Sequence, residues 1–201
     1  MAAPTLEQLL TELLEPQNPG IRRATARLKE ALEEPRAGEE LAALLRGADR
    51  PQVRQFSAVL LRRLLKRLRP ELIQRLPTLL VEALEEEPDP PVRLSLVHLG
   101  AQLLPRAGPR IWAPLGRWVE EAAAGGDPRR KEGALQLLGV AVGVAPALVG
   151  VSRSPAHLLG LLRGGLRAGN SPGILQKGLR ALGGVVGALP GGGPKSQIGD
   201  F

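Results

Sequence analysis

The side chains that could do chemistry in this sequence are mainly charged groups, because nucleophiles and metal ligands are scarce. There is no cysteine, which excludes a disulfide framework and any zinc site built from thiolates. The two histidines, His98 and His157, are too few for a metal cluster with normal ligand spacing. We find no glycine-rich phosphate loop with a lysine and no serine paired with a usable histidine. The sequence therefore predicts a protein that is not an enzyme and needs no cofactor.

Two charged segments are candidates for binding. A basic stripe is expected to lie on one long helix and consists of Arg62, Arg63, Lys66, Arg67 and Arg69. It could be no more than a solvated helix face, since long basic side chains often cover helix surfaces with their aliphatic stems. The alternative is that part of this stripe contacts a partner.

The second charged segment is acidic and ends a predicted helix. It consists of Glu82, Glu85, Glu86 and Glu87. Carboxylates at a helix C-terminus oppose the helix dipole, so helix stability is a poor explanation for them. They could form a solvated loop edge. The sharper interpretation is that Glu82, Glu85 and Glu86 contact a basic partner.

Both charged segments belong to a repeat that runs through the chain. Five segments align on a proline, at Pro19, Pro51, Pro90, Pro128 and Pro172. A proline in the first turn of a helix gives up no useful N–H, and the positions two and nine residues further on share one helix face. Those two positions are apolar in four of the five segments. In three of the five, an aspartate precedes the proline as a predicted cap: Asp49, Asp89 and Asp127. The pattern predicts five helices that each bury one face.

Leucine-rich helices are expected between these five, over residues 5–14, 38–47, 70–86, 110–124 and 155–167. A helix pair repeated about every 40 residues is typical of HEAT and armadillo arrays. The predicted fold class is all-α, an α-α superhelix (HEAT/armadillo-like solenoid) of about five helix pairs over residues 1–189. Residues 190–201 have no apolar period and are expected to form a glycine-rich disordered tail.

The composition agrees with a helical core. Aromatic residues make up only 2% of the chain and tyrosine is absent, so the core must be built from leucine, valine and alanine. Trp112 and Trp118 are expected to be packing residues, and His98 a core or groove residue. The stretch 133–152 carries no charge and is long enough to be weighed as a membrane span. Pro146 and the repeat register favour a buried helix plus a connection, so no membrane association is predicted.

One basic residue recurs three residues after the proline in four of the five segments: Arg22, Arg54, Arg93 and Lys131. Recurrence in successive repeats is what stacking between neighbours predicts. We therefore expect these cations to be structural, each bridging to an acid or a carbonyl of a neighbouring repeat.

Several segments also carry a family resemblance. The stretch PQVRQFSAVLLRRLLK (51–66) resembles the signature of the amino-terminal domain of the importin-β superfamily. The segments at 6–28, 92–103, 132–142 and 171–182 extend the likeness over residues 5–189. This resemblance implies a nuclear transport receptor that shuttles between cytoplasm and nucleus. Its implied partners are basic cargo proteins such as histones and ribosomal proteins, nucleoporins, and the Ran GTPase in its GTP form.

In such a receptor, the resemblance implies that Ran binds the inner surface of the amino-terminal repeats. The candidate contacts are Gln55, Arg62 and Lys66, predicted to lie opposite a buried stripe made of Val53, Phe56, Leu60 and Leu64. The alternative function is a helical-repeat scaffold that binds other proteins or nucleic acid through a basic face. Nucleic acid is the less favoured partner, because only four aromatic residues are available to stack on bases.

Overall fold

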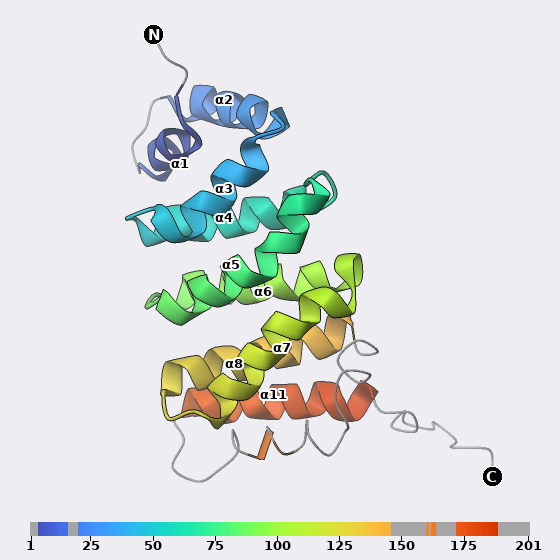
Figure 1. Cartoon of the computed structure of the whole chain (residues 1–201). Helices are drawn as coiled ribbons and strands as arrows, with labels where there is room; N and C mark the ends of the chain where they lie inside the picture. Colours follow the sequence, from blue (N-terminus) through green and yellow to red (C-terminus); the bar gives the residue numbers. More distant parts are fainter. Residues whose placement is uncertain (1–3, 16–19, 146–159, 161, 164–171, 189–201) are drawn as a thin grey trace, which may run out of the picture. The chain divides into compact units, whose positions relative to one another are not determined.

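The computed structural model describes residues 4–15, 20–145, 160, 162–163 and 172–188. Every regular element in this part of the chain is a helix, and Figure 1 shows the order along the chain. The helices are α1 (Leu6–Leu14), α2 (Ile21–Glu33), α3 (Ala37–Gly47), α4 (Pro51–Leu64), α5 (Pro70–Glu86), α6 (Pro90–Ala107), α7 (Pro109–Ala124), α8 (Pro128–Val144) and α11 (Pro172–Ala188). The all-α prediction is confirmed, while the helix expected at 155–167 and the tail at 190–201 fall largely or wholly outside the described residues.

Local signals set most of these boundaries. Proline stands in the first turn of α4, α5, α6 and α8. Asp89 caps α6 by accepting the Val92 N–H at 3.1 Å, and Asp127 accepts the Arg129 N–H at the start of α8. The prediction for Asp49 was wrong, because Arg50 occupies the cap position of α4 and no side chain caps that helix.

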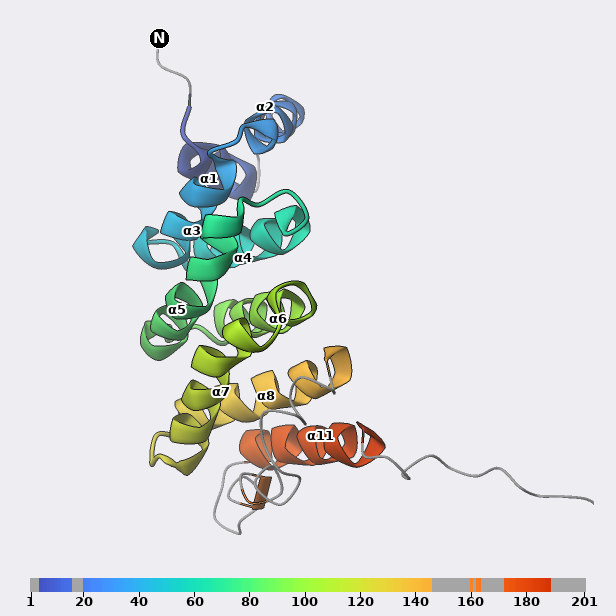
Figure 2. The same ribbon diagram turned by 45° about the vertical axis from the view of Figure 1, so that its right-hand side comes forward.

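The chain divides into two compact units, Met1–Gly116 and Arg117–Phe201, and each is described by itself. In the first unit, α3 packs on α4, α5 packs on α6, and each of these helices also packs on its counterpart one repeat away. Figures 1 and 2 show α4 and α6 side by side in both views. This is the two-layer stacking of a helical-repeat array. Its core consists mainly of leucine, including Leu41, Leu61, Leu76 and Leu96, with alanine as the second most frequent residue.

The predicted buried face is present in α4 and α6, where Val53 and Val92 are each 1% exposed. The equivalent residue of α2, Ile21, is 48% exposed. Phe56 was predicted to belong to the buried stripe of α4, but it is 43% exposed. The reason is the position of the buried arc, which is centred on Ser57 and leaves Phe56 at its margin.

In the second unit, α8 packs along α11. Gly139 allows α8 to approach α11 closely, because a Cβ atom at this position would lie 3.3 Å from the Cα of Ala181. The uncharged stretch that begins at Gly133 supplies the buried residues of α8, as predicted, although Gly143 and Val144 near the end of the helix are exposed. Its last part, residues 146–152, lies outside the described residues. None of the helices that the structure describes is long and apolar enough to cross a membrane. Trp112 in the first unit and Trp118 in the second are both buried, which confirms them as packing residues.

Candidate functional site

The predicted Ran-contacting residues belong to α4 and to the turn that follows it. Gln55 and Arg62 lie on α4 and are half-buried, whereas Lys66 is exposed and lies beyond the last helical residue, Leu64. The expectation of one long basic helix was therefore wrong. The chain turns after Leu64, whose carbonyl accepts the N–H groups of Arg67 and Leu68 at 2.7 and 3.1 Å. A new helix begins at Pro70, and the residue before a proline is disfavoured in helical conformation.

Arg62 has a neighbour that the sequence did not pair with it. His98 of α6 is half-buried, and its pKa is lowered first by burial and second by the positive charge of Arg62. The two side chains therefore lie near each other although they come from successive repeats. This agrees with the interpretation of His98 as a core or groove residue.

Both α4 and α6 also expose apolar side chains. Phe56 is 43% exposed and Leu94 of α6 is 39% exposed. We call Gln55, Phe56, Arg62, Leu94 and His98, together with Lys66 in the turn after α4, the α4–α6 surface. A mixture of an exposed aromatic, an aliphatic residue, an arginine and polar groups is typical of protein–protein interfaces rather than of catalytic sites.

The predicted acidic contact at the end of α5 is engaged within the chain. Arg46 of α3 forms ion pairs with Glu82 at 2.6 Å and with Glu86 at 3.0 Å. Glu85 is exposed and also interacts within the chain. These pairs explain why carboxylates stand at the unfavourable end of a helix. A contact of these glutamates with a basic partner stays a prediction, and such a partner must compete with Arg46.

Of the four recurring basic residues, Arg54 bridges to a neighbouring repeat as predicted, whereas Arg93 bonds within its own repeat. The guanidinium of Arg54 donates to both carboxylate oxygens of Glu87 and also to the carbonyls of Ala48 and Asp49. The hydrogen bond to Glu87 is the main cause that raises the pKa of Arg54. Arg93 donates to the carbonyls of Glu87 and Pro88, six and five residues before it, as Arg54 does to Ala48 and Asp49 in its own repeat.

Further ion pairs join residues that are roughly one repeat apart. Arg50 pairs with Glu15, Arg67 with Glu33, and Arg75 with Glu39. Opposite charges separated by about one repeat were visible in the sequence, but many such combinations exist there. Only the stacking of the helices selects the combinations that form.

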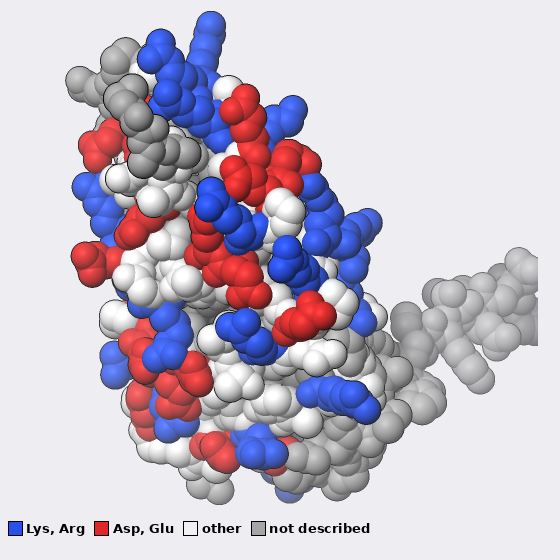
Figure 3. Space-filling model, turned by 45° about the horizontal axis from the view of Figure 1, so that its top comes forward, with Lys and Arg blue, Asp and Glu red and all other residues white. Residues whose placement is uncertain are grey.

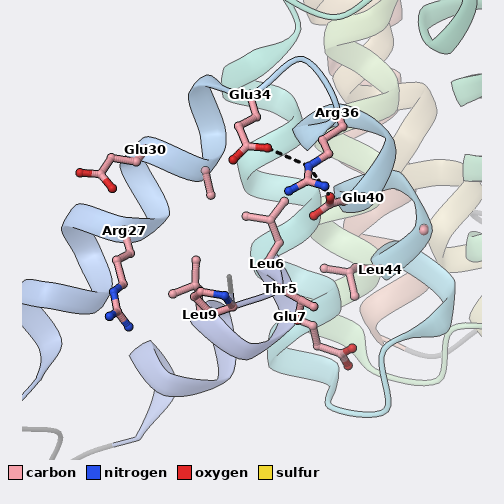
Figure 4. Close-up of a pocket in the computed structure, with 13 residues that line it drawn as sticks. Thr5, Leu6, Glu7, Leu9, Arg27, Glu30, Glu34, Arg36, Glu40 and Leu44 are labelled. Carbon is pink, nitrogen blue, oxygen red and sulfur yellow. Dashed lines mark hydrogen bonds and ion pairs between the residues drawn. The ribbon is translucent and has the colours of Figure 1, made fainter. Parts of the chain in front are cut away.

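An open groove of about 720 Å³ lies between α1, α2 and α3 (Figure 4). At its edge Arg36 pairs with Glu34 at 2.7 Å and with Glu40 at 3.2 Å, and Arg27 and Glu30 of α2 also line it. The groove contains no histidine. No group of residues suited to a metal ion occurs in the described part of the chain.

Comparison with known proteins agrees with this architecture. No family model matches the chain. Human importin-4 is 38% identical over 188 residues, which is 90% of this chain, and mouse importin-4 is 36% identical over 181 residues, or 88%. The chain spans only 17% and 16% of the lengths of these two relatives.

Solved structures show the same fold. The crystal structure of Kap121p bound to Nup53p matches with a TM-score of 0.75 at 21% identity, over 92% of this chain and 18% of Kap121p. The crystal structure of Kap121p bound to RanGTP matches equally well, with the same TM-score, identity and coverage. At this level of identity, the likeness concerns the helical-repeat fold alone.

Proposed function

Because this chain belongs by sequence to the importin-β superfamily, we propose that it serves nuclear transport by binding the Ran GTPase in its GTP form through the α4–α6 surface. The main observation in support of this proposal is that the surface combines a half-exposed aromatic residue, Phe56, with Arg62 and Gln55 on one helix. Interfaces concentrate their binding energy in aromatic and arginine side chains of this kind. Kap121p, which has the same fold, was crystallised with RanGTP, and this supports the choice of partner.

The similarity to importins also suggests partners other than Ran. We propose that the chain serves import of basic cargo proteins, with histones and ribosomal proteins as the expected class, and that it meets nucleoporins while shuttling between cytoplasm and nucleus. Glu82, Glu85 and Glu86 are the proposed contacts for a basic partner. Kap121p bound to Nup53p and Kap121p bound to Pho4p are structures of the same fold. Nothing in the proposal requires a cofactor.

Binding by this chain should be weaker than binding by a whole receptor. The chain spans about a sixth of the length of its relatives, so it offers fewer repeats to a globular partner. Long-range charge would speed the encounter, but selectivity for the GTP form must come from shape and hydrogen bonds on the surface.

The proposal is tested by titrating the chain against Ran loaded with a GTP analogue or with GDP. We expect clear preference for the GTP form, and about tenfold weaker binding by the double variant Arg62→Glu, Lys66→Glu at unchanged helicity. The matched control is Arg106→Glu, Arg110→Glu, which reverses two positive charges at exposed positions on α6 and α7 and so changes the net charge by the same amount. Equal affinity for both nucleotide states would reject Ran recognition. Unchanged binding by the double variant would reject only the choice of residues.

A further inference from the structure

The charges of α2 are placed against its helix dipole. Arg22 and Arg23 stand in the first turn, which contains no acid, while the last turn contains no base and includes Glu30 and Glu33. Gly20 at the cap position provides no side-chain hydrogen bond. The positive end of a helix dipole disfavours nearby cations, so this arrangement costs helix stability. Its explanation must therefore lie outside the helix itself.

Ion pairs with residues outside the helix explain the acids at the end of α2, but not the arginines at its start. Glu33 pairs with Arg67, and Glu34, which follows the helix, pairs with Arg36. In contrast, Arg22 and Arg23 are exposed and form no ion pair with any residue that the structure describes. Residues 16–19, which precede α2, carry no charge in the sequence and so supply no acid.

The first turns of α2 thus present an accessible cationic surface with an aliphatic residue at its edge. It consists of Ile21, Arg22, Arg23 and Arg27, which we call the α2 basic surface. Figure 3 shows lysine and arginine side chains gathered at the top of that view, over α2. Ile21 is 48% exposed, whereas the corresponding Val53 and Val92 are buried, so its apolar side chain is also available for contact.

We propose that the α2 basic surface binds an acidic segment of a partner protein, one that carries an aliphatic side chain among its carboxylates. The guanidinium group of an arginine can donate two hydrogen bonds to one carboxylate. The positive end of the helix dipole adds to the attraction between the arginines and the carboxylates of the partner. Ile21 gives the aliphatic side chain a contact that water cannot replace. Nucleic acid fits less well, because α2 has no aromatic residue on which bases stack. This site is distinct from the α4–α6 surface.

The test measures binding of a fluorescein-labelled peptide rich in glutamate and leucine to the full chain. The double variant Arg22→Glu, Arg23→Glu should bind about tenfold more weakly than the parent chain. It should also melt at the same or a higher temperature, because acids in the first turn favour the helix dipole. Loss of binding therefore cannot be ascribed to unfolding. Ile21→Ser should weaken binding of this peptide but leave binding of a glutamate–alanine peptide unchanged.

The control is again Arg106→Glu, Arg110→Glu, which changes the net charge equally at a distance from α2. If this control loses as much affinity as the α2 variant, only net charge matters and the site is rejected. Unchanged binding by the α2 variant rejects it too. If single-stranded oligouridine binds the chain more tightly than the peptide, and the α2 variant loses that binding, the partner class is nucleic acid and the proposal is overturned.

Discussion

Arg54 donates from Nε and Nη2 to the two carboxylate oxygens of Glu87, at 2.7 and 3.0 Å, and so joins the start of α4 to the end of α5. The Glu87 side chain is only 3% exposed. The same carboxylate accepts the N–H of Asp89, which caps α6. One ion pair therefore connects two loops that hold the two helices of the α4–α6 surface in place.

Removing Arg54 should be strongly destabilising. The variant Arg54→Ala leaves Glu87 buried without its guanidinium, and we expect a loss of about 3–5 kcal/mol in the free energy of unfolding. The double variant Arg54→Leu, Glu87→Leu should lose less than the single variant, because no charge then remains buried. Urea denaturation monitored by circular dichroism measures both, with the exposed Arg63→Ala as control. A single variant as stable as the parent would contradict the prediction.

His98 should make stability depend on pH in the acidic range. Burial and the charge of Arg62 lower the pKa of His98 below its ordinary value of 6.5, so the folded state binds the proton less readily than the unfolded chain. This contribution to stability is complete above pH 6.5 and is lost as the pH falls through the lowered pKa. His98→Gln should flatten the profile of urea midpoint against pH over this range.

The effect of Arg62 on the pKa of His98 can be measured directly. Arg62→Gln removes the like charge and should raise the pKa of His98, as followed by NMR titration of its ring protons. Part of the lowering should remain, since burial is the larger cause. An unchanged pKa would show that Arg62 does not act on His98.

Two glycines of α8 should respond in opposite directions. Gly139→Leu forces a side chain against Ala181 of α11 and should cost about 1–3 kcal/mol. Gly143 has nothing within 4 Å of the position of an added Cβ, so Gly143→Ala should stabilise the helix by up to about 1 kcal/mol. Thermal unfolding of both variants is the measurement. A tolerated leucine at position 139 would argue against close packing of α8 on α11.

Arg46 should act as a competitor for any basic partner of the acidic run. Its ion pairs with Glu82 and Glu86 are solvent-exposed, so Arg46→Ala should cost no more than about 1 kcal/mol of stability. The same variant should bind a lysine-rich peptide severalfold more tightly. Titration by fluorescence anisotropy measures this, and Glu82→Gln, Glu86→Gln should abolish the gain. An affinity that Arg46→Ala leaves unchanged would count against these glutamates as a contact site.

Much of the candidate site could be placed from the sequence, but its chemistry could not. Gln55 and Arg62 were assigned to a helix of the second repeat, and they lie there. Lys66 was assigned to the same helix and lies in the turn after it, because Pro70 begins a new helix only a few residues on. His98 could not be paired with Arg62 from sequence, since their neighbourhood depends on how two repeats stack.

The sequence by itself determined the all-α class, the repeat and most helix starts, because proline placement, capping and the spacing of leucines act within a few residues of each other. Only the tertiary structure decided which charges meet and which apolar residues remain exposed. Arg54 and Glu87 are 33 residues apart, and their pairing requires one particular stacking of neighbouring repeats. Ile21 and Val53 occupy the same position of the repeat, yet only Val53 is buried, because burial depends on what packs against a helix as well as on the helix itself.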